Sequence, residues 1–197
     1  MGEHSENVTW HAPAVTREAR AQAGAPGLTV WLTGLPASGK STIAAALEDA
    51  LLKGGRPAYL LDGDNLRHGL NGDLGFSAAD RAENVRRSAE VARLFADAGL
   101  VALVSLVSPY AADRARARAL HARDGLRFLE VYVNTPLEEC ERRDPKGLYA
   151  KSRAGELPGF TGIDDPYEAP ERPELELRPA EQGLGEAVAA VLALLDP

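Results

Sequence analysis

The stretch LTVWLTGLPASGKSTIAAAL, residues 28–47, decides the fold of this 197-residue chain. Its first six residues are rich in β-branched and apolar side chains, which is typical of a short buried strand. Residues 34–41, GLPASGKS, fit the pattern G-x-x-x-x-G-K-[ST]. The alanine-rich segment that follows predicts a helix over 41–53, ended by a glycine pair. A strand, a glycine-rich loop and a helix in this order predict a binding site for a nucleoside triphosphate.

The residue types of this loop explain the expectation. Glycines let the backbone curl so that successive N–H groups point at phosphate oxygens, and the helix adds its positive amino end. Lys40 is expected to reach the β- and γ-phosphates, and the hydroxyl of Ser41 to bind Mg²⁺. We therefore predict ATP binding at Gly34, Leu35, Pro36, Ala37, Ser38, Gly39, Lys40, Ser41 and Thr42.

Apolar strands and helices alternate along the rest of the chain. Strands are expected at 28–33, 57–62, 100–107, 127–133 and 174–177, and helices at 41–53, 77–98, 111–123, 136–143 and 185–195. Because the strands are apolar throughout, they predict a doubly wound, mostly parallel α/β sheet with helices on both faces. Residues 1–27 form an expected leader segment, 28–197 one domain, and the glycine-rich stretch 142–168 a lid.

Composition limits the classes of function. A formal net charge of −7 argues against a general nucleic-acid binder. The single cysteine, Cys140, excludes an internal disulfide framework and suits a reducing compartment. No apolar run reaches the roughly 18 residues that cross a bilayer, and the first ten residues lack the pattern of a secretory signal. We therefore expect a cytoplasmic protein that binds neither nucleic acid nor membrane.

An acidic pair, Asp62 and Asp64, follows the second expected strand in the sequence DGDNLR. In a parallel sheet the end of that strand lies on the same edge as the phosphate loop. Carboxylates there can hold a metal-bound water or accept a proton from an attacking hydroxyl. Asp-Gly is also common in turns, but its place beside the loop favours a functional role. No acid follows the third strand, which leaves Asp62 as the candidate near the metal.

Further along, Phe76, Arg81 and Asn84 combine an aromatic ring with polar groups on one face of a helix that Ser77 caps. Arginine suits an anionic group and an aromatic ring suits a nucleobase. On these residues alone, a solvated helix face with a core phenylalanine is the favoured alternative. Ser108, after the third strand, is equally well a site residue or a strand-ending hydroxyl.

Taken together, these stretches resemble the adenylylsulfate kinase (APS kinase) family. The resemblance runs from NVTWHAPAVTREAR (7–20) to DDPYEAPERPELEL (164–177). Its most specific parts are LDGDNLRHGLNGDLGFSAADRAENVRR (61–87) and DPKGLYAKSRAGELPGFTGIDDPYE (144–168). It implies a P-loop kinase fold and transfer of the γ-phosphoryl group of MgATP to the ribose 3′-hydroxyl of adenosine 5′-phosphosulfate (APS). The product would be 3′-phosphoadenosine 5′-phosphosulfate.

The resemblance also implies roles for individual residues. Lys40 would be catalytic, and Asp62, supported by Asp64, would act as the base or hold a metal-bound water. Ser41 and, through water, Asp62 would bind Mg²⁺, and Arg142 would contact ATP. Phe76 and Phe160 would enclose the substrate adenine, and Ser108 would line the site rather than accept the phosphoryl group. The implied substrate-binding set is Asp62, Arg67, Phe76, Arg81, Asn84, Val107, Ser108, Lys146 and Phe160.

The family further implies a homodimer and a functional link to an ATP sulfurylase. Ala111 and Pro13 depart from the family pattern, and the first could remove one charged contact. Two alternatives remain: a P-loop kinase acting on another adenylylated or sugar acceptor, and a nucleotide-dependent switch without acceptor chemistry. The absence of an N-K-x-D-like guanine motif argues against the switch.

Overall fold

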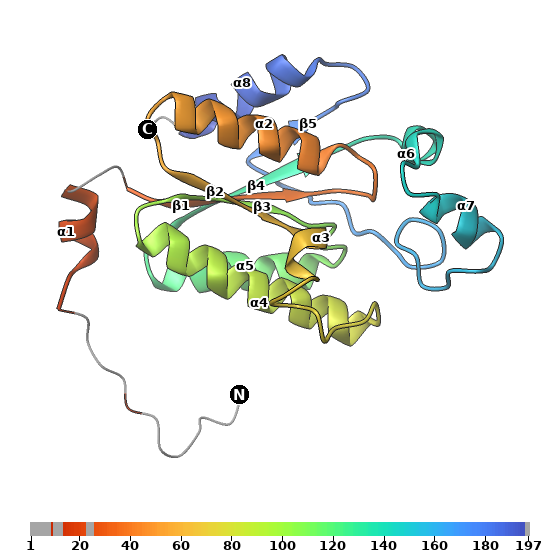
Figure 1. Ribbon diagram of the computed structural model, residues 1–197, viewed down its shortest axis with the longest axis horizontal. Helices are drawn as coiled ribbons and strands as arrows, with labels where there is room; N and C mark the ends of the chain where they lie inside the picture. The colour runs from red at the N-terminus through yellow and green to blue at the C-terminus, as the bar shows by residue number, and fades with distance from the viewer. Residues whose placement is uncertain (1–8, 10–13, 23–25, 196–197) are drawn as a thin grey trace.

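A five-stranded parallel sheet forms the centre of the molecule (Figure 1). The computed structural model describes residue 9, residues 14–22 and residues 26–195. The strand order is β2-β3-β1-β4-β5, and every neighbouring pair is parallel. The strands are β1 (Leu28–Thr33), β2 (Ala58–Asp62), β3 (Val101–Ser105), β4 (Arg127–Val133) and β5 (Leu175–Leu177).

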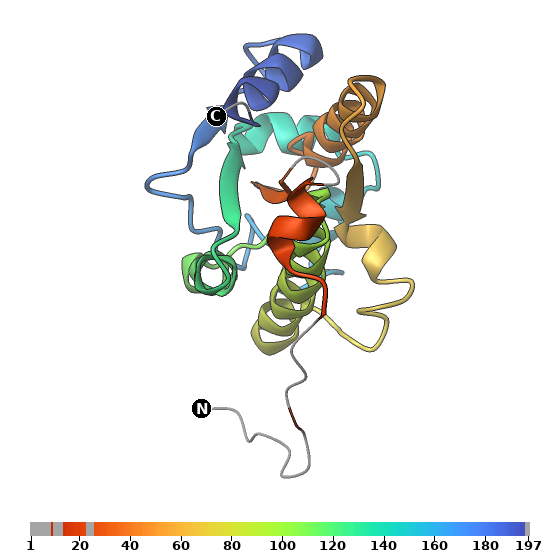
Figure 2. The same cartoon turned by 90° about the vertical axis from the view of Figure 1, so that its left-hand side faces the viewer.

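Helices cover both faces of this sheet, which confirms the predicted doubly wound architecture (Figures 1 and 2). On one face, α2 (Lys40–Lys53) and α8 (Leu184–Leu195) pack against alternate residues of β1, such as Val30 and Leu32. On the other face, α4 (Ala78–Asp97) and α5 (Ala111–Arg123) pack against Trp31. All six residues of β1 are buried because apolar helices lie on both sides of it.

The predicted strands and long helices are confirmed, with ends that differ by one or two residues. The third strand ends at Ser105 rather than 107, and residues 106–109, which follow it, line the cavity described below. The prediction did not include the short helices α1 (Arg17–Gln22), α3 (Gly63–Leu66) and α7 (Leu148–Arg153). Four to six residues are too few to show a helical hydrophobic period.

The expected leader is described in part. In α1, Arg17 and Arg20 both pair with Asp97 at the end of α4. These ion pairs attach the helix to the domain near the start of β1 (Figure 2). Pro13, where the sequence departs from the family, lies outside the described residues. In the described part of the chain, no helix is both long enough and apolar enough to cross a membrane.

The expected lid stretch lies beyond the sheet, on the side where the phosphate loop joins α2 (Figure 1). It includes the end of α6 (Leu137–Arg143) and the whole of α7. Cys140, Tyr149 and Phe160 form a small core of their own, against which Leu35 and Ala37 of the phosphate loop pack. The stretch is therefore ordered around its own apolar cluster, next to the loop.

Candidate active site

The phosphate loop leaves β1 at Gly34 and enters α2 at Lys40. A side chain at Gly34 would place its Cβ 2.5 Å from the carbonyl oxygen of Val133, so the close approach of the two backbones requires glycine. Gly39 is the N-cap of α2, with a left-handed φ of 107° and no side-chain capping hydrogen bond. The first N–H groups of α2 therefore have no side-chain cap and are free to bind an anion.

Lys40 is buried beneath the loop. Its Nζ donates to the carbonyl oxygens of Gly34 at 3.0 Å and Leu35 at 2.7 Å. Burial lowers the pKa of Lys40 to about 8, although Asp62 and Asp64 act in the opposite direction. The ammonium group is thus held without a carboxylate in direct contact. A bound phosphate would supply the missing anionic partner.

The acidic pair joins the loop where β2 and β3 end. The Ser41 hydroxyl donates to Oδ2 of Asp62 at 2.6 Å and lies 3.2 Å from Oγ of Ser105. Asp62 and Ser105 are direct partners in the parallel register, which explains why they meet. The other carboxylate oxygen of Asp62 accepts from the backbone N–H of Asp64 at 3.0 Å and caps α3. The carboxylate is therefore fixed in place.

The oxygen atoms of Ser41 and Asp62 suit Mg²⁺, which prefers hard oxygen ligands. Among the described residues, no group of three or more histidine, cysteine, aspartate or glutamate side chains could hold a metal by itself. Mg²⁺ bound to one or two protein oxygens usually completes its shell with water and substrate phosphates. The donor set therefore fits a magnesium ion that binds together with a nucleotide.

Arg67, Arg81 and Phe76 form a second lining surface of the same cavity, which we call the cationic wall. The ring of Phe76 is 60% exposed, and the guanidinium carbons of Arg67 and Arg81 lie 4.2 Å and 5.7 Å from its centroid. Arg81 also donates to the carbonyl oxygens of Phe76 and Gly159, at 3.0 Å and 2.7 Å. Two cations beside one aromatic ring create a local site for an aromatic anion in an otherwise acidic protein.

Asn84 lies one turn along α4 from Arg81 and is buried. Its side-chain oxygen, Oδ1, accepts a hydrogen bond from the side-chain amide of Asn71 at 2.9 Å. With its oxygen engaged, Asn84 has its N–H₂ group left to donate to a ligand. Both Asn84 and Arg81 line the same cavity.

The lid stretch closes the other side of this space. Lys146 forms an ion pair with Asp64, which links the lid to the end of β2. Asp164 accepts hydrogen bonds from the backbone N–H groups of Gly159 and Phe160, both at 2.6 Å. Phe160 is buried edge-on against Tyr149, with 4.9 Å between ring centroids. The two expected adenine contacts therefore differ, because Phe76 is open to solvent and Phe160 belongs to the lid core.

One cavity of about 990 Å³ connects these elements. Its volume is at the upper end of the range for small-molecule sites, about 300–1,000 Å³. The expected site residues that line it are Pro36, Ala37, Gly39, Lys40, Ser41, Thr42, Asp62, Asp64, Arg67, Phe76, Arg81, Asn84, Val107, Ser108, Lys146 and Phe160. The structure thus brings the loop, the acidic pair, the cationic wall and the lid together.

Some expected residues do not line the cavity. Gly34, Leu35 and Ser38 of the phosphate loop are not among the lining residues, and Ser38 is fully buried. Arg142, expected to contact ATP, has a side chain that is 74% exposed and pairs with Glu139.

Its neighbour Arg143 lines the cavity instead and donates to the carbonyl oxygen of Ser38 at 3.4 Å. Consecutive residues of a helix point about 100° apart, so one member of the Arg142–Arg143 pair faces the loop and the other faces solvent. Sequence reasoning missed Arg143, because two adjacent arginines carry no spacing signal that distinguishes them.

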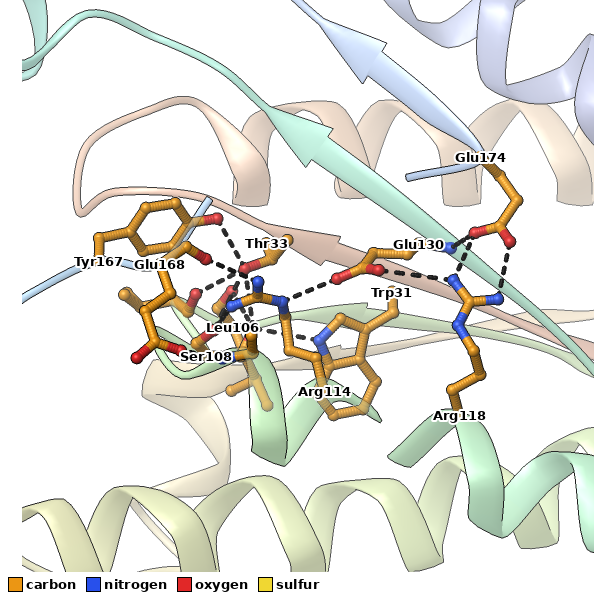
Figure 3. A network of polar contacts seen from close by, with 12 residues as sticks. Trp31, Thr33, Leu106, Ser108, Arg114, Arg118, Glu130, Tyr167, Glu168 and Glu174 are labelled. Atoms are coloured by element: carbon orange, nitrogen blue, oxygen red, sulfur yellow. Dashed lines mark hydrogen bonds and ion pairs between the residues drawn. The ribbon is translucent and has the colours of Figure 1, made fainter. Parts of the chain in front are cut away.

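Ser108 is one of the residues that line the cavity, and its hydroxyl is directed toward Trp31 and Thr33 (Figure 3). The residue is 3% exposed. Its Oγ accepts from the indole N–H of Trp31 at 3.1 Å and donates to Oγ1 of Thr33 at 2.9 Å. A hydroxyl with both partners inside the protein is poorly placed to accept a phosphoryl group, which supports the lining role.

A phosphate loop between β1 and α2, beside a small-molecule cavity, and the strand order β2-β3-β1-β4-β5 are the architecture of the P-loop kinases. Residues 26–178 match the sequence model of the family described as Adenylylsulphate kinase. The chain therefore belongs to the adenylylsulphate kinase family.

Individual relatives agree with this assignment. The chain is 53% identical to an adenylyl-sulfate kinase of Geotalea uraniireducens, over 100% of this chain and 94% of the relative. It is 59% identical to that of Citrobacter koseri, over 99% of this chain and 96% of the relative. A solved APS kinase of Mycobacterium tuberculosis, in complex with AMPPNP and APS, superposes with a TM-score of 0.85 at 57% identity. The match covers 87% of this chain and 99% of the solved chain.

Proposed function

We propose that this protein transfers the γ-phosphoryl group of ATP to the ribose 3′-hydroxyl of APS and forms 3′-phosphoadenosine 5′-phosphosulfate. The observation that carries the proposal is the direct bond between Ser41 of the phosphate loop and Asp62 of the acidic pair. This bond joins the phosphate loop to the end of β2 within the cavity that the cationic wall also lines. The solved relative that binds AMPPNP and APS supports the same pair of substrates.

On the donor side, residues 34–42 hold the triphosphate through backbone N–H groups. Lys40 places its charge on the transferring phosphoryl group, where negative charge must be stabilised. Its present partners are carbonyl oxygens of the loop, and these are weaker partners than phosphate oxygens. We assign the further cationic contact with ATP to Arg143 in place of Arg142, because Arg143 faces the loop.

On the acceptor side, Arg67, Arg81 and Asn84 bind the phosphosulfate and ribose of APS. Phe76 stacks on the adenine from its exposed side, and Phe160 contacts it from the lid. Val107 and Ser108 form the edge beneath the ribose. Lys146 contacts the substrate when the lid closes. These roles describe an acceptor in which a planar base is joined through a ribose to two neighbouring anionic groups.

Asp62 acts as the base that accepts the proton of the 3′-hydroxyl, or as the holder of a metal-bound water, with Asp64 supporting it. Its carboxylate is held by the Ser41 hydroxyl on one oxygen and by the N–H of Asp64 on the other, which fixes it at the end of β2. Direct in-line transfer requires no enzyme intermediate, in agreement with the inward position of the Ser108 hydroxyl.

Ser41 and, through water, Asp62 would hold Mg²⁺. When bound, the ion neutralises charge on the β- and γ-phosphates and orients them. The protein supplies two oxygen ligands at most in this arrangement, so we expect Mg²⁺ to bind tightly only together with ATP.

We further propose a cytoplasmic homodimer that works after an ATP sulfurylase, the class of enzyme that produces APS. Residues 1–27 are its leader segment and residues 28–197 its kinase domain, with a lid at about 142–168. The buried, unpaired Cys140 is in keeping with a reducing compartment. Light scattering of the purified chain tests the dimer, and a monomeric mass would contradict it.

The test of the activity uses the purified full-length chain with MgATP and APS, and chromatographic detection of the 3′-phosphorylated product. Gluconate, shikimate and adenosine each replace APS as the acceptor in parallel reactions. We expect product from APS, with Lys40→Ala reduced to near background. Turnover of another acceptor with none of APS, or unchanged kcat in Lys40→Ala, would contradict the proposal.

A further inference from the structure

Arg114 is a buried cation of α5 that none of the proposed chemistry uses. Its side chain is 3% exposed and does not line the active-site cavity. Its three guanidinium nitrogens donate to three separate parts of the fold (Figure 3). These are the carboxylate of Glu130 on β4 at 2.7 Å, the carbonyl oxygen of Ser108 at 2.7 Å and the carbonyl oxygen of Glu168 at 2.6 Å.

The Ser108 contact reaches the edge of the acceptor site. Ser108 has a φ of 40°, in the left-handed region that residues other than glycine rarely adopt. Such a conformation persists only when its surroundings hold it. Here Arg114 binds the carbonyl oxygen of Ser108, while Trp31 and Thr33 bind its hydroxyl. Arg114 therefore helps to hold the edge formed by Val107 and Ser108.

The Glu168 contact reaches the end of the lid stretch. The N–H of Glu168 donates to the carbonyl oxygen of Pro109 at 2.9 Å, and its carboxylate accepts from the N–H of Ala111 at 2.6 Å. Three residues earlier, Asp165 accepts from the hydroxyl of Tyr110 at 2.9 Å and lies 3.7 Å from Arg81. Hydrogen bonds thus connect residues 165–168, at the end of the lid stretch, to residues 109–111, which directly follow the edge formed by Val107 and Ser108.

The charge of Arg114 is balanced within the same network. Glu130 is buried and also lies 3.4 Å from Arg118, which makes a bidentate pair with Glu174 at 2.7 Å (Figure 3). Arg118 lies one helical turn after Arg114 on α5, and both side chains contact the carboxylate of Glu130. Arg118 is 37% exposed, and among the described residues its polar contacts are with Phe128, Glu130 and Glu174 rather than with residues 107–111 or the lid stretch, which makes it a matched control.

We propose that Arg114 is a positioning residue for the acceptor: it holds Ser108 and Glu168 in a fixed relation, so that the site edge and the lid together fit APS. This inference rests on the proposed function. The planar guanidinium is suited to the task, because its N–H groups point in several fixed directions at once. A lysine would keep the charge opposite Glu130 but could not maintain all the contacts.

The experiment compares Arg114→Lys with Arg118→Lys in steady-state kinetics, with APS and ATP varied in turn. We expect Arg114→Lys to raise the KM for APS about tenfold while the KM for ATP changes by less than about twofold. Arg118→Lys should leave both within about twofold of the unchanged protein. Circular dichroism of each variant during heating shows whether the fold is retained.

A second readout is the fluorescence of Trp31, whose indole N–H is bonded to Ser108. In a Trp10→Phe background, we expect the titration midpoint for APS, measured with AMPPNP present, to rise in Arg114→Lys by the same factor as the KM. Glu168→Ala provides a second variant, because it loses the bond to Ala111 and leaves the buried Arg114–Glu130 pair in place. It should raise the KM for APS in the same direction.

Equal changes in both KM values, or equal effects of the Arg114 and Arg118 variants, would overturn the proposal in favour of a general structural role. If Arg114→Lys does not fold, an unchanged KM for APS in Glu168→Ala overturns it instead. The failure of the proposed function looks different. In that case the unchanged protein gives no product from APS, whereas failure of this inference alone leaves that turnover intact.

Discussion

Ser41 and Asp62 are joined by a hydrogen bond of 2.6 Å, so the first turn of α2 is bonded directly to the end of β2. The two residues are 21 positions apart in the chain, and the parallel sheet brings them together by placing the ends of its strands on one edge. Ser41 belongs to the phosphate loop, where we propose that ATP binds, and Asp62 is the residue that we propose acts on the acceptor. The bond marks where the two proposed substrates meet.

Removing the charge of Asp62 should impair turnover more than binding. Asp62→Asn keeps an oxygen that can accept from Ser41 but loses the negative charge and the basicity. We expect kcat to fall by about 10²–10⁴-fold, the usual contribution of a positioned acid or base. The KM for APS should change by less than about threefold. Asp49→Asn, at an exposed ion pair on α2, is the control. A kcat of Asp62→Asn within about threefold of the original value would exclude Asp62 as the base or metal-water holder.

Nucleotide binding should depend on pH through Lys40. Burial lowers the pKa of the free Lys40 ammonium to about 8, and bound phosphate should raise it again. Above about pH 8, binding therefore has to take up a proton, and the Kd should rise about tenfold per pH unit. Calorimetry with MgAMPPNP at about pH 7 and about pH 9, in two buffers of different ionisation enthalpy, measures both effects. Absence of proton uptake at the higher pH would refute this assignment.

The adjacent arginines of α6 should differ in function. Both Arg142 and Arg143 pair with Glu139, but Arg143 alone of the two faces the phosphate loop. Arg143→Ala should raise the KM for ATP about 10- to 150-fold, which corresponds to the loss of about 1.5–3 kcal/mol for one hydrogen bond to a charged group. Arg142→Ala should leave it unchanged and serves as the matched control. A larger effect at Arg142 than at Arg143 would show that this assignment is wrong.

Phe76 should contribute to acceptor binding and little to stability, because its ring is 60% exposed. Stacking of a base on an aromatic ring contributes about 1–3 kcal/mol, so Phe76→Ala should raise the KM for APS about 5- to 150-fold. The midpoint of thermal unfolding should stay within about 2 °C. Leu94→Ala, at an exposed apolar residue of α4, the helix that begins two residues after Phe76, should change neither quantity. An unaltered KM in Phe76→Ala would remove this residue from the site.

His121 should make the fold sensitive to mild acid. The ring is buried, with Nε2 2.9 Å from the Thr29 hydroxyl and Nδ1 2.8 Å from the carbonyl oxygen of Ala117. Burial lowers the pKa of His121 in the folded state. The unfolded chain binds this proton at about pH 6.5 and the folded chain at a lower pH, so the free energy of unfolding falls as the pH drops below about 6.5.

Urea unfolding at about pH 7.5 and about pH 5.5 measures this loss, which is at most about 1.4 kcal/mol per pH unit for one group. His121→Gln cannot take up the proton, and its unfolding should lose that part of the pH dependence. An identical pH dependence in the two proteins would contradict the role of His121.

Much of the fold could be predicted because its signals are local. The apolar run of β1, the glycine pair after α2 and the cap of α4 each lie within a few consecutive residues. In the structure, Ser77 accepts from the N–H of Asp80 at 3.1 Å, as the capping pattern predicts. The short helices α3 and α7 were missed, since neither is long enough for a hydrophobic period and their neighbours in space hold them.

The sequence by itself determined the parallel architecture and the phosphate loop. The apolar runs of the strands, the glycine spacing and the Lys40–Ser41 pair each lie within a few consecutive residues, so they can be recognised without knowledge of the fold. The sequence also carried the family resemblance, and with it the expected acceptor residues. Only the tertiary structure decided how these residues are presented: Phe76 open, Phe160 buried in the lid, the Ser108 hydroxyl turned inward, and Arg143 rather than Arg142 at the loop. The physical reason is that burial and side-chain direction at this edge depend on contacts between segments far apart in the chain.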